Sequence, residues 1–534
     1  MNRNLLIFYF LFATSISVAQ IRSSVSNLLR YGNGEQTLGL STNKFLYFEN
    51  LTDARFSLPQ NVTFGLRLLY DKPPEVGLPF QGISRRFVEY KKNNLFLRVG
   101  NSSELYGRGL VLNLFENRGL AFDTWIDGIK ASYKLGKLKA SLIAGTIEFT
   151  DSINIIRTEE YEVRGGNVEY KFLKSAKVGL TFVSSEAKIP QFNQSIANTK
   201  AELPELYVDF SKGPFNAFIN WAHKWTNSTD LNRKSKGYGV YSAFSYAGES
   251  FGVTIDYKNY RFDIQDPFLR NDETRTTKFM PFQNPPIVMK EHSYTLLSRA
   301  LHEVNFNDEV GFQVDANYSF NDDFNINLNF SMASRHNSYE YNSSSFNFNK
   351  IERDNNFLPS SDDEFSPFTE IFAEGEYYFN YNTAIRFGAA HREKTIYNDF
   401  TGITGSHIIK STVIPFQFQH PFSNNFSTIV QYEYESVNDN FNTGQENFYN
   451  QFVSIITSIY SKASVAIRYE FTDNKFDLSG RKDWLLGEIG YRITGKNLIT
   501  LSYGRERGGQ VCSNGICRYI LPFKGFRLAL QTSL

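Results

Sequence analysis

The chain has no excess of positive or negative charge, has few cysteines and contains no long apolar run after residue 20. Of its 534 residues, 56 are basic and 55 are acidic, which leaves a formal net charge of +1. Such a chain has no overall field that would draw it to nucleic acid or to an anionic membrane surface. Beyond residue 20, no apolar run approaches the length of about 18 residues that a membrane-spanning helix needs. We therefore expect neither a helical membrane protein nor a nucleic-acid partner.

Sequence motifs of common enzymes and metal sites are also missing. The seven histidines are scattered without the spacing of a zinc site, and there is no nucleophile elbow, P-loop or dinucleotide-binding motif. We predict no catalytic, cofactor-binding or metal-binding residues, so the chain is not expected to be an enzyme. A hydrolase built from Ser, His and Asp on different strands is a less favoured alternative, because such triads are recognised by geometry rather than by chain order.

The first 19 residues have the features of a secretory signal peptide. Arg3 gives a positive start, residues 5–18 are mostly apolar, and Ser17-Val18-Ala19 places small residues before the expected cleavage site. Cleavage would leave residues 20–534 as the exported chain. A buried N-terminal helix or a retained anchor is the alternative interpretation.

Apolar and polar residues alternate along much of the exported chain. Within residues 323–332, the alternating apolar residues are Phe324, Ile326, Leu328, Phe330 and Met332, and the residues between them are asparagine or serine. Residues 312–320 show the same pattern, and Asn321-Asp322 is predicted to join the two segments as a hairpin. Successive side chains of a strand point to opposite faces, so each strand has one apolar and one polar face. The pattern predicts an all-β fold, a single large antiparallel transmembrane β-barrel.

The predicted strands number about 18–24, with about 22 as the best count. Short turns such as residues 173–175 alternate with longer polar stretches, which we predict to be loops at 185–202, 261–292, 335–366 and 436–447. Short turns on one rim and long loops on the other are typical of outer-membrane barrels. Strand-like segments begin by residue 62, which leaves little chain for the N-terminal plug of a TonB-dependent receptor.

Large aromatic side chains are expected where the predicted strands meet the lipid headgroups. The candidates, which lie near the ends of predicted strands, are Trp221, Trp225, Tyr434 and Trp484.

A charged, glycine-containing segment interrupts the alternation at residues 100–128. Its charged residues are Glu104, Arg108, Glu116, Arg118, Asp123 and Asp127. Such a composition suits a loop folded into the barrel lumen, where opposed carboxylates and guanidinium groups select solutes at a constriction. The alternative is a set of structural salt bridges and turns inside the barrel.

The two cysteines, Cys512 and Cys517, are separated by Ser513-Asn514-Gly515-Ile516. Asn-Gly favours a tight hairpin turn, which places the two thiols opposite each other, and an exported location permits oxidation. A metal site is the weaker alternative, because no histidine lies nearby. We predict a disulfide in an exposed hairpin before the last strand, with Arg518 and Tyr519 at the barrel rim.

Several stretches carry a resemblance to a known family. They are Arg98-Val99-Gly100 with Glu104-Leu105-Tyr106-Gly107-Arg108-Gly109-Leu110, then residues 115–123, Gly405-Ser406-His407, and the tail at residues 508–519. On these stretches the chain resembles an uncharacterised family of outer-membrane β-barrel proteins found in Bacteroidota. The resemblance runs through most of the exported chain and implies a barrel in the outer membrane, without an assigned reaction.

Three functions fit this prediction. We favour a pore for small solutes, with a docking platform in an envelope or secretion complex as the alternative and an outer-membrane hydrolase as the least favoured. The expected partners are outer-membrane lipid, the barrel-assembly machinery during insertion and, for a platform, other envelope proteins. We expect no cofactor.

Overall fold

The computed structural model describes residues 21–38, 41–151, 157–190, 195–230, 232–262, 280–299, 301–345, 347–398, 405–477, 479–513 and 515–534. The predicted signal peptide at residues 1–19 lies outside these residues and stays a prediction. None of the helices in the described ranges is both long and apolar enough to cross a membrane.

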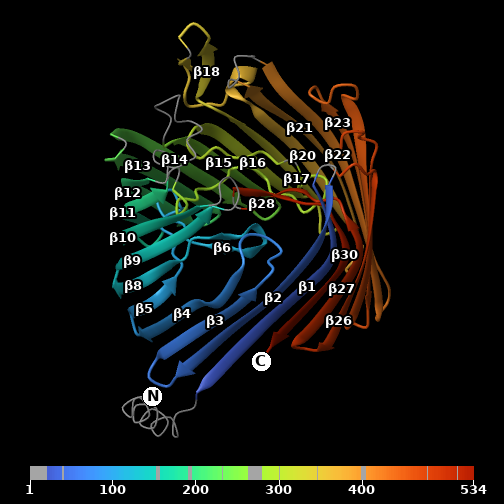
Figure 1. The fold of residues 1–534 in the computed structure, drawn as a ribbon, viewed down its shortest axis with the longest axis horizontal. Helices are drawn as coiled ribbons and strands as arrows, with labels where there is room; N and C mark the ends of the chain where they lie inside the picture. Colours follow the sequence, from blue (N-terminus) through green and yellow to red (C-terminus); the bar gives the residue numbers. More distant parts are fainter. Residues whose placement is uncertain are drawn as a thin grey trace.

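In the part of the chain that the structure describes, twenty-four antiparallel strands form one closed barrel. Figure 1 shows these strands curving around the interior. In order around the wall, the strands are β1 (Arg22–Leu38), β2 (Ser41–Leu58), β3 (Val62–Asp71), β4 (Phe80–Lys92), β5 (Leu95–Ser102), β8 (Ile126–Leu135), β9 (Leu138–Asp151), β10 (Arg157–Leu173), β11 (Ala176–Pro190), β12 (Ile196–Lys212), β13 (Phe215–Ser228), β14 (Arg233–Ala247), β15 (Phe251–Arg261), β16 (Glu309–Ser319), β17 (Phe324–Ser334), β20 (Phe368–Asn380), β21 (Thr383–Asn398), β22 (Gly405–Ser423), β23 (Phe426–Asp439), β24 (Asn447–Ile459), β25 (Ala463–Thr472), β26 (Asp483–Thr494), β27 (Asn497–Glu506) and β30 (Phe523–Ser533). The first strand pairs with both β2 and β30, which closes the wall. The predicted fold class is confirmed, although the best count of about 22 strands was too low.

The remaining described elements are short and do not pair with the strands of the wall. They are the ribbons β6 (Glu116–Asn117) with β7 (Phe122–Asp123), β18 (Asn337–Asn342) with β19 (Asn347–Glu352), and β28 (Gly509–Ser513) with β29 (Ile516–Ile520), and the single turns η1 (Arg118–Leu120) and η2 (Asp363–Phe365).

The two rims of the barrel differ as predicted. The start of β1 and the end of β30 lie at the rim with the short turns, such as residues 174–175 between β10 and β11. The opposite rim carries the long connections, which are residues 103–125, 262–308, 335–367 and 507–522. We refer to these two edges as the short-turn rim and the long-loop rim.

One predicted loop is wrong. Most of residues 185–202 belong to β11 and β12, which pair with each other up to Pro190 and Ile196. The inward positions here are small or apolar, such as Ala187 and Ile189, and the outward positions are charged, such as Glu186 and Lys188. The outward polarity resembled that of a loop, but it belongs to strands that continue beyond the apolar part of the wall.

The outward face of the barrel is apolar and exposed. Leu142, Leu180 and Ile219 are each about 60% exposed, whereas their inward neighbours such as Ile143 are buried. Exposed aromatic side chains gather near the short-turn rim, namely Phe320, Tyr377, Phe379, Tyr381, Phe422, Phe426 and Tyr460. This apolar belt is the inverse of the surface of a soluble protein.

The predicted headgroup aromatics divide into two groups. Trp221 and Trp225 lie on the outward face of β13 and are exposed. Trp484, in contrast, is only 3% exposed. It points into the barrel, where the guanidinium of Arg507 lies 5.0 Å from the centre of its ring. The prediction for Trp484 is therefore wrong. The contents of the barrel cover this ring as lipid headgroups would, and the sequence alone does not distinguish the two environments.

Candidate functional site in the barrel interior

Three of the long connections turn back into the barrel and contact one another. We call the described parts of residues 103–125, 280–308 and 507–522 the inner layer. The backbone N–H of Asn113 donates to the carbonyl of Phe282 at 2.8 Å, and the Arg518 guanidinium donates to the carbonyl of Leu120 at 3.0 Å. In Figure 1, β6 and β28 lie inside the ring of strands. The inner layer thus joins chain segments that are far apart in sequence.

An apolar core holds the first segment of the layer. Leu110, Val111 and Leu112 are completely buried, and the side chains around them come from the inward faces of β9 to β15. These wall residues include Ile143, Tyr161, Val183, Leu203, Phe218, Ala222, Tyr241 and Tyr260. The lumen is therefore not lined by polar residues throughout, because one part of it is packed like a protein interior.

Ion pairs attach the same segment to another part of the wall, β1 to β3. Arg118 Nε donates to Glu49 Oε1 on β2 at 2.8 Å, and Asp71 on β3 lies 3.2 Å from the same guanidinium. Glu116 accepts from Arg67 on β3 at 2.6 Å. The Glu49 carboxylate is almost completely buried and also pairs with Arg30 on β1. A network of alternating charges thus links residues 116–118 to the first three strands.

The six charged residues predicted for a constriction do not form one cluster. Glu116, Arg118 and Asp123 share one network, in which Asp123 accepts from Arg85 at 2.5 Å. Glu104 and Asp127 form separate pairs, with Lys130 and Arg86, both at 3.1 Å. Five of the six residues are therefore engaged in ion pairs.

Arg108 is the exception among the six. Its guanidinium lies 4.9 Å from the centre of the Phe218 ring, and no ion pair joins it to a carboxylate within the described residues. It lines a cavity of about 480 Å³ between the inner layer and the wall, together with Tyr241, Asp256 and Lys290. Arg108 is thus the predicted residue that is best placed to meet a solute.

The second segment of the layer follows the inner wall from β15 to β25. Lys258 on β15 donates to the carbonyl of Ile287 at 2.6 Å. The backbone N–H groups of Thr295 and Leu296 donate to Glu433 on β23 at 2.8 and 2.7 Å, and Arg299 pairs with Glu470 on β25. The sequence analysis missed these wall residues, although each is a charged residue at a polar position of a strand.

Two buried polar side chains of this segment, Tyr294 and His292, have partners on the wall. The hydroxyl of Tyr294 donates to Glu374 at 2.5 Å. Burial raises the pKa of this hydroxyl, and the neighbouring Glu374 carboxylate raises it further, so Tyr294 stays a donor. His292 Nε2 lies 2.8 Å from Glu370, which also pairs with Arg392. These contacts fix the segment in position.

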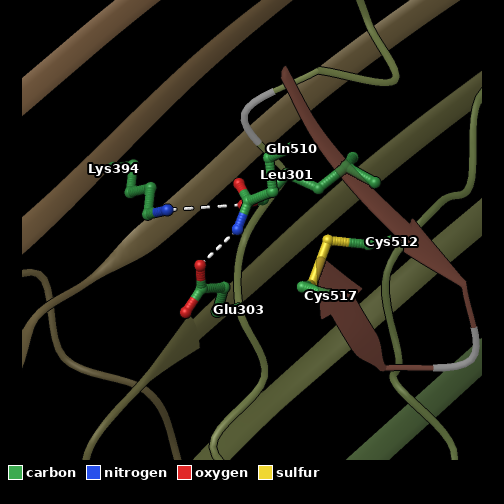
Figure 2. The surroundings of a disulfide bond; sticks show 6 residues. All are labelled: Leu301, Glu303, Lys394, Gln510, Cys512 and Cys517. Atoms are coloured by element: carbon green, nitrogen blue, oxygen red, sulfur yellow. Dashed lines mark hydrogen bonds between the residues drawn. A yellow bond between two sulfur atoms is a disulfide. The ribbon is translucent and has the colours of Figure 1, made fainter. Parts of the chain in front are cut away.

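The predicted disulfide between Cys512 and Cys517 is confirmed. The two residues face each other in the ribbon of β28 and β29, and Gly515 has the positive φ of +77° that its turn requires, whereas Asn514 lies outside the described residues. Figure 2 shows the bond beside Leu301, with Gln510 donating to Glu303 nearby.

The predicted exposed position of this hairpin is wrong. Both cysteines are half-buried, and Cys512 packs against a small apolar cluster of Met289, Leu301 and Phe368. Arg518, which was expected at the rim, bonds to Leu120 inside the barrel, whereas Tyr519 stays exposed. A hairpin of mixed polarity gives no indication from sequence alone that other loops cover it.

The disulfide is expected to matter little for the stability of the wall. A loop this short loses little unfolded-state entropy on cross-linking, so a Cys512→Ser/Cys517→Ser variant should lose only about 2 kcal/mol. The variant should still insert into the membrane as a folded barrel. In gel electrophoresis its unheated and heated samples should therefore migrate differently, as those of the wild type do. Mass spectrometry of the non-reduced wild type should show one internal bond, and free thiols there, or a variant that fails to assemble, would contradict this expectation.

Histidines in the described chain are engaged in local contacts. His336 Nδ1 lies 2.9 Å from Asp308, and its Nε2 is taken by Asn259 at 3.1 Å, so this His-Asp pair has no free ring nitrogen for a nucleophile. Within the described ranges, no group of three or more His, Cys, Asp or Glu side chains is arranged to hold a metal ion.

Comparison with known proteins finds a family and distant structural likenesses. A model described as a family of unknown function (DUF6029) matches residues 1–534. None of the curated proteins matches the sequence. The siderophore receptor PirA from Pseudomonas aeruginosa is 8% identical, with a TM-score of 0.48, over 96% of this chain and 80% of that chain.

Two further solved structures have similar values. The translocation pore of the P pilus usher PapC is 7% identical, with a TM-score of 0.43, over 96% of this chain and 99% of that chain. OccK2 (OpdF) from Pseudomonas aeruginosa is 11% identical, with a TM-score of 0.39, over 73% of this chain and 96% of that chain. Likenesses at this level assign no activity to the chain.

Proposed function

The chain belongs to a family of unknown function, DUF6029, and from this premise we propose that it is an outer-membrane barrel that passes small polar solutes through a narrowed lumen. The observation that carries the proposal is a closed 24-stranded wall that is apolar outside and holds charged cavities inside. The predicted origin in Bacteroidota and the predicted use of the barrel-assembly machinery stay part of this proposal.

The apolar belt supports a location in a membrane. A closed barrel leaves no unpaired strand edge, so its backbone polar groups are satisfied without water. Side chains such as Leu142 and Leu180 are exposed on its outer face, where only lipid would cover them favourably. Long loops on one rim are typical of the outside of the cell, so we assign the long-loop rim to the cell exterior.

The inner layer supports a narrow passage rather than a wide channel. Barrels of about 16–18 strands already enclose an aqueous channel, so a wall of 24 strands would be wider still without its filling. Between the layer and the wall there remain cavities of about 480, 510 and 320 Å³. The second of these is lined by Arg299, Arg507 and Glu470. Cavities of this size and polarity suit small, hydrated solutes.

A docking platform is the second candidate. The completely buried Leu110, Val111 and Leu112 favour it, because an apolar core across part of the lumen is also suited to a barrel that stays closed. In that case the protein would hold fixed envelope partners and would not conduct.

Conductance of the purified, folded protein in planar bilayers tests the proposal. We expect small, reproducible steps from the wild type, because the inner layer leaves only narrow routes. Arg118→Met, which removes an ion pair between the inner layer and the wall, serves as the positive control and should give larger steps. A silent wild type beside a conducting Arg118→Met variant would overturn the pore and favour the platform.

Ion selectivity should depend on Arg108 if the passage follows its cavity. Arg108→Met removes a positive charge from the cavity lining, so the ratio of cation to anion permeability should rise. Reversal potentials in a salt gradient measure this ratio. Arg86→Met, which removes an exposed guanidinium from β4, is the matched control and should leave the ratio unchanged. Equal ratios in both variants would place the passage elsewhere.

A further inference from the structure

Part of the connection between β17 and β20 lies on the outside of the barrel. Asn259 donates from its side chain to the carbonyl of Asn356 at 2.8 Å, and the Tyr257 hydroxyl donates to the carbonyl of Phe357 at 2.8 Å. Tyr257 and Asn259 alternate with inward residues of β15 and share the outward face with the exposed Ile255. Residues 355–358 are therefore fixed against the outer wall, at the upper edge of the apolar belt.

The base of this connection is held firmly. His336 lies at its start and binds both Asp308 and Asn259. The backbone N–H of Arg335 donates to the carbonyl of Phe365 at 2.8 Å, and that of Ser360 donates to the Ser334 hydroxyl at 2.8 Å. Both ends of the segment are thus attached to the wall, and its position does not depend on a partner.

The tip of the segment exposes two large apolar side chains. Phe357 is 74% exposed and Leu358 is 55% exposed. The side chain of Asn355 accepts from the backbone N–H groups of both residues, at 2.9 and 3.3 Å. The Asn355 side chain thus satisfies the backbone N–H groups of Phe357 and Leu358 within the turn.

We propose that Phe357 and Leu358 insert into the lipid leaflet at the long-loop rim and anchor this connection to the membrane surface. The proposal rests on the membrane location proposed above. Lipid fits because the tip continues the belt directly above Ile255 on the same outward face. Lipid also fits because both backbone polar groups of Phe357 already have partners within the chain, which a hydrocarbon environment requires and a protein partner does not.

Spin labelling in liposomes tests the anchor. Phe357→Cys carries the label, since Cys512 and Cys517 are bonded to each other and do not react without a reductant. Collisions of the label with oxygen, which concentrates in lipid, are compared with collisions with a water-soluble nickel chelate. We expect an oxygen-to-nickel ratio several times that of a label in water. Leu358→Cys, labelled in the same way, gives a second reading from the same tip.

Two control positions make the outcomes distinguishable. Leu328→Cys reports on the belt, and Phe441→Cys reports on water at the long-loop rim, where Phe441 is exposed and stacks on His407. Nickel access at residues 357 and 358 equal to that at 441, with lipid access at 328, would overturn the anchor and leave the barrel in its membrane. Nickel access at residue 328 as well would overturn the membrane location itself.

Discussion

Replacing Arg118 with methionine is expected to loosen the inner layer and to enlarge the conductance steps, while the wall stays folded. The substitution leaves the Glu49 and Asp71 carboxylates without one of their cations, and Glu49 is almost completely buried. Breaking a buried ion pair from one side costs about 3–5 kcal/mol. The Arg118 side chain is 28% exposed, and Glu49 keeps its ion pair with Arg30. We therefore expect a loss of stability at the lower end of this range, about 3 kcal/mol.

Arg108→Met is the matched control for this prediction. Both arginines belong to the same segment, but Arg108 contacts an aromatic ring rather than a carboxylate among the described residues. Its replacement should leave the resistance of residues 103–125 to proteolysis close to that of the wild type, whereas Arg118→Met should lower it. Equal resistance in the two variants would show that the ion-pair network does not hold the layer.

Leu328→Arg is expected to destabilise the barrel by about 2–4 kcal/mol if this position lies deep in the bilayer. Leu328 is 51% exposed on the outward face of β17, so an arginine there would meet hydrocarbon. The reversible unfolding of the barrel in liposomes with denaturant measures the loss.

Gln419→Arg provides a control at the same distance from the short-turn rim. Gln419 lies four positions from the end of β22, as Leu328 lies four positions from the start of β17. It shares the inward face of β22 with the buried Val413, and its own side chain is exposed to the lumen. The free energy of unfolding should change little. Equal losses in the two variants would contradict the assignment of the outward face to lipid.

Local patterns in the sequence were sufficient to predict the wall. Alternation such as that around Leu328 predicts both the strands and their outward faces, because the two faces of a strand meet different solvents. The hairpin at Cys512 and Cys517 was also predictable from its turn residues. The prediction of a loop at residues 185–202 was wrong. Beyond the apolar belt, the outward residues of a strand face water and are as polar as those of a loop.

The interior was predictable only in part, because its contacts join residues that are distant in sequence. Six charged residues marked the segment at 100–128, but nothing local indicates that Arg118 meets Glu49 while Arg108 does not. The second segment, residues 280–308, overlaps a stretch that was predicted only as a loop, and its partners such as Glu433 differ from other polar strand residues only by what they face.

The position of the hairpin with Cys512 and Cys517 also bears on the order of assembly. This hairpin directly precedes β30, the strand that pairs with β1 and closes the wall. It also supplies Arg518 to Leu120, a contact between residues nearly four hundred positions apart. Contacts of such separation form late, because a long chain must first be brought together. Residues 509–533 therefore complete both the wall and its filling, so a barrel that is not yet closed also lacks the last part of its inner layer.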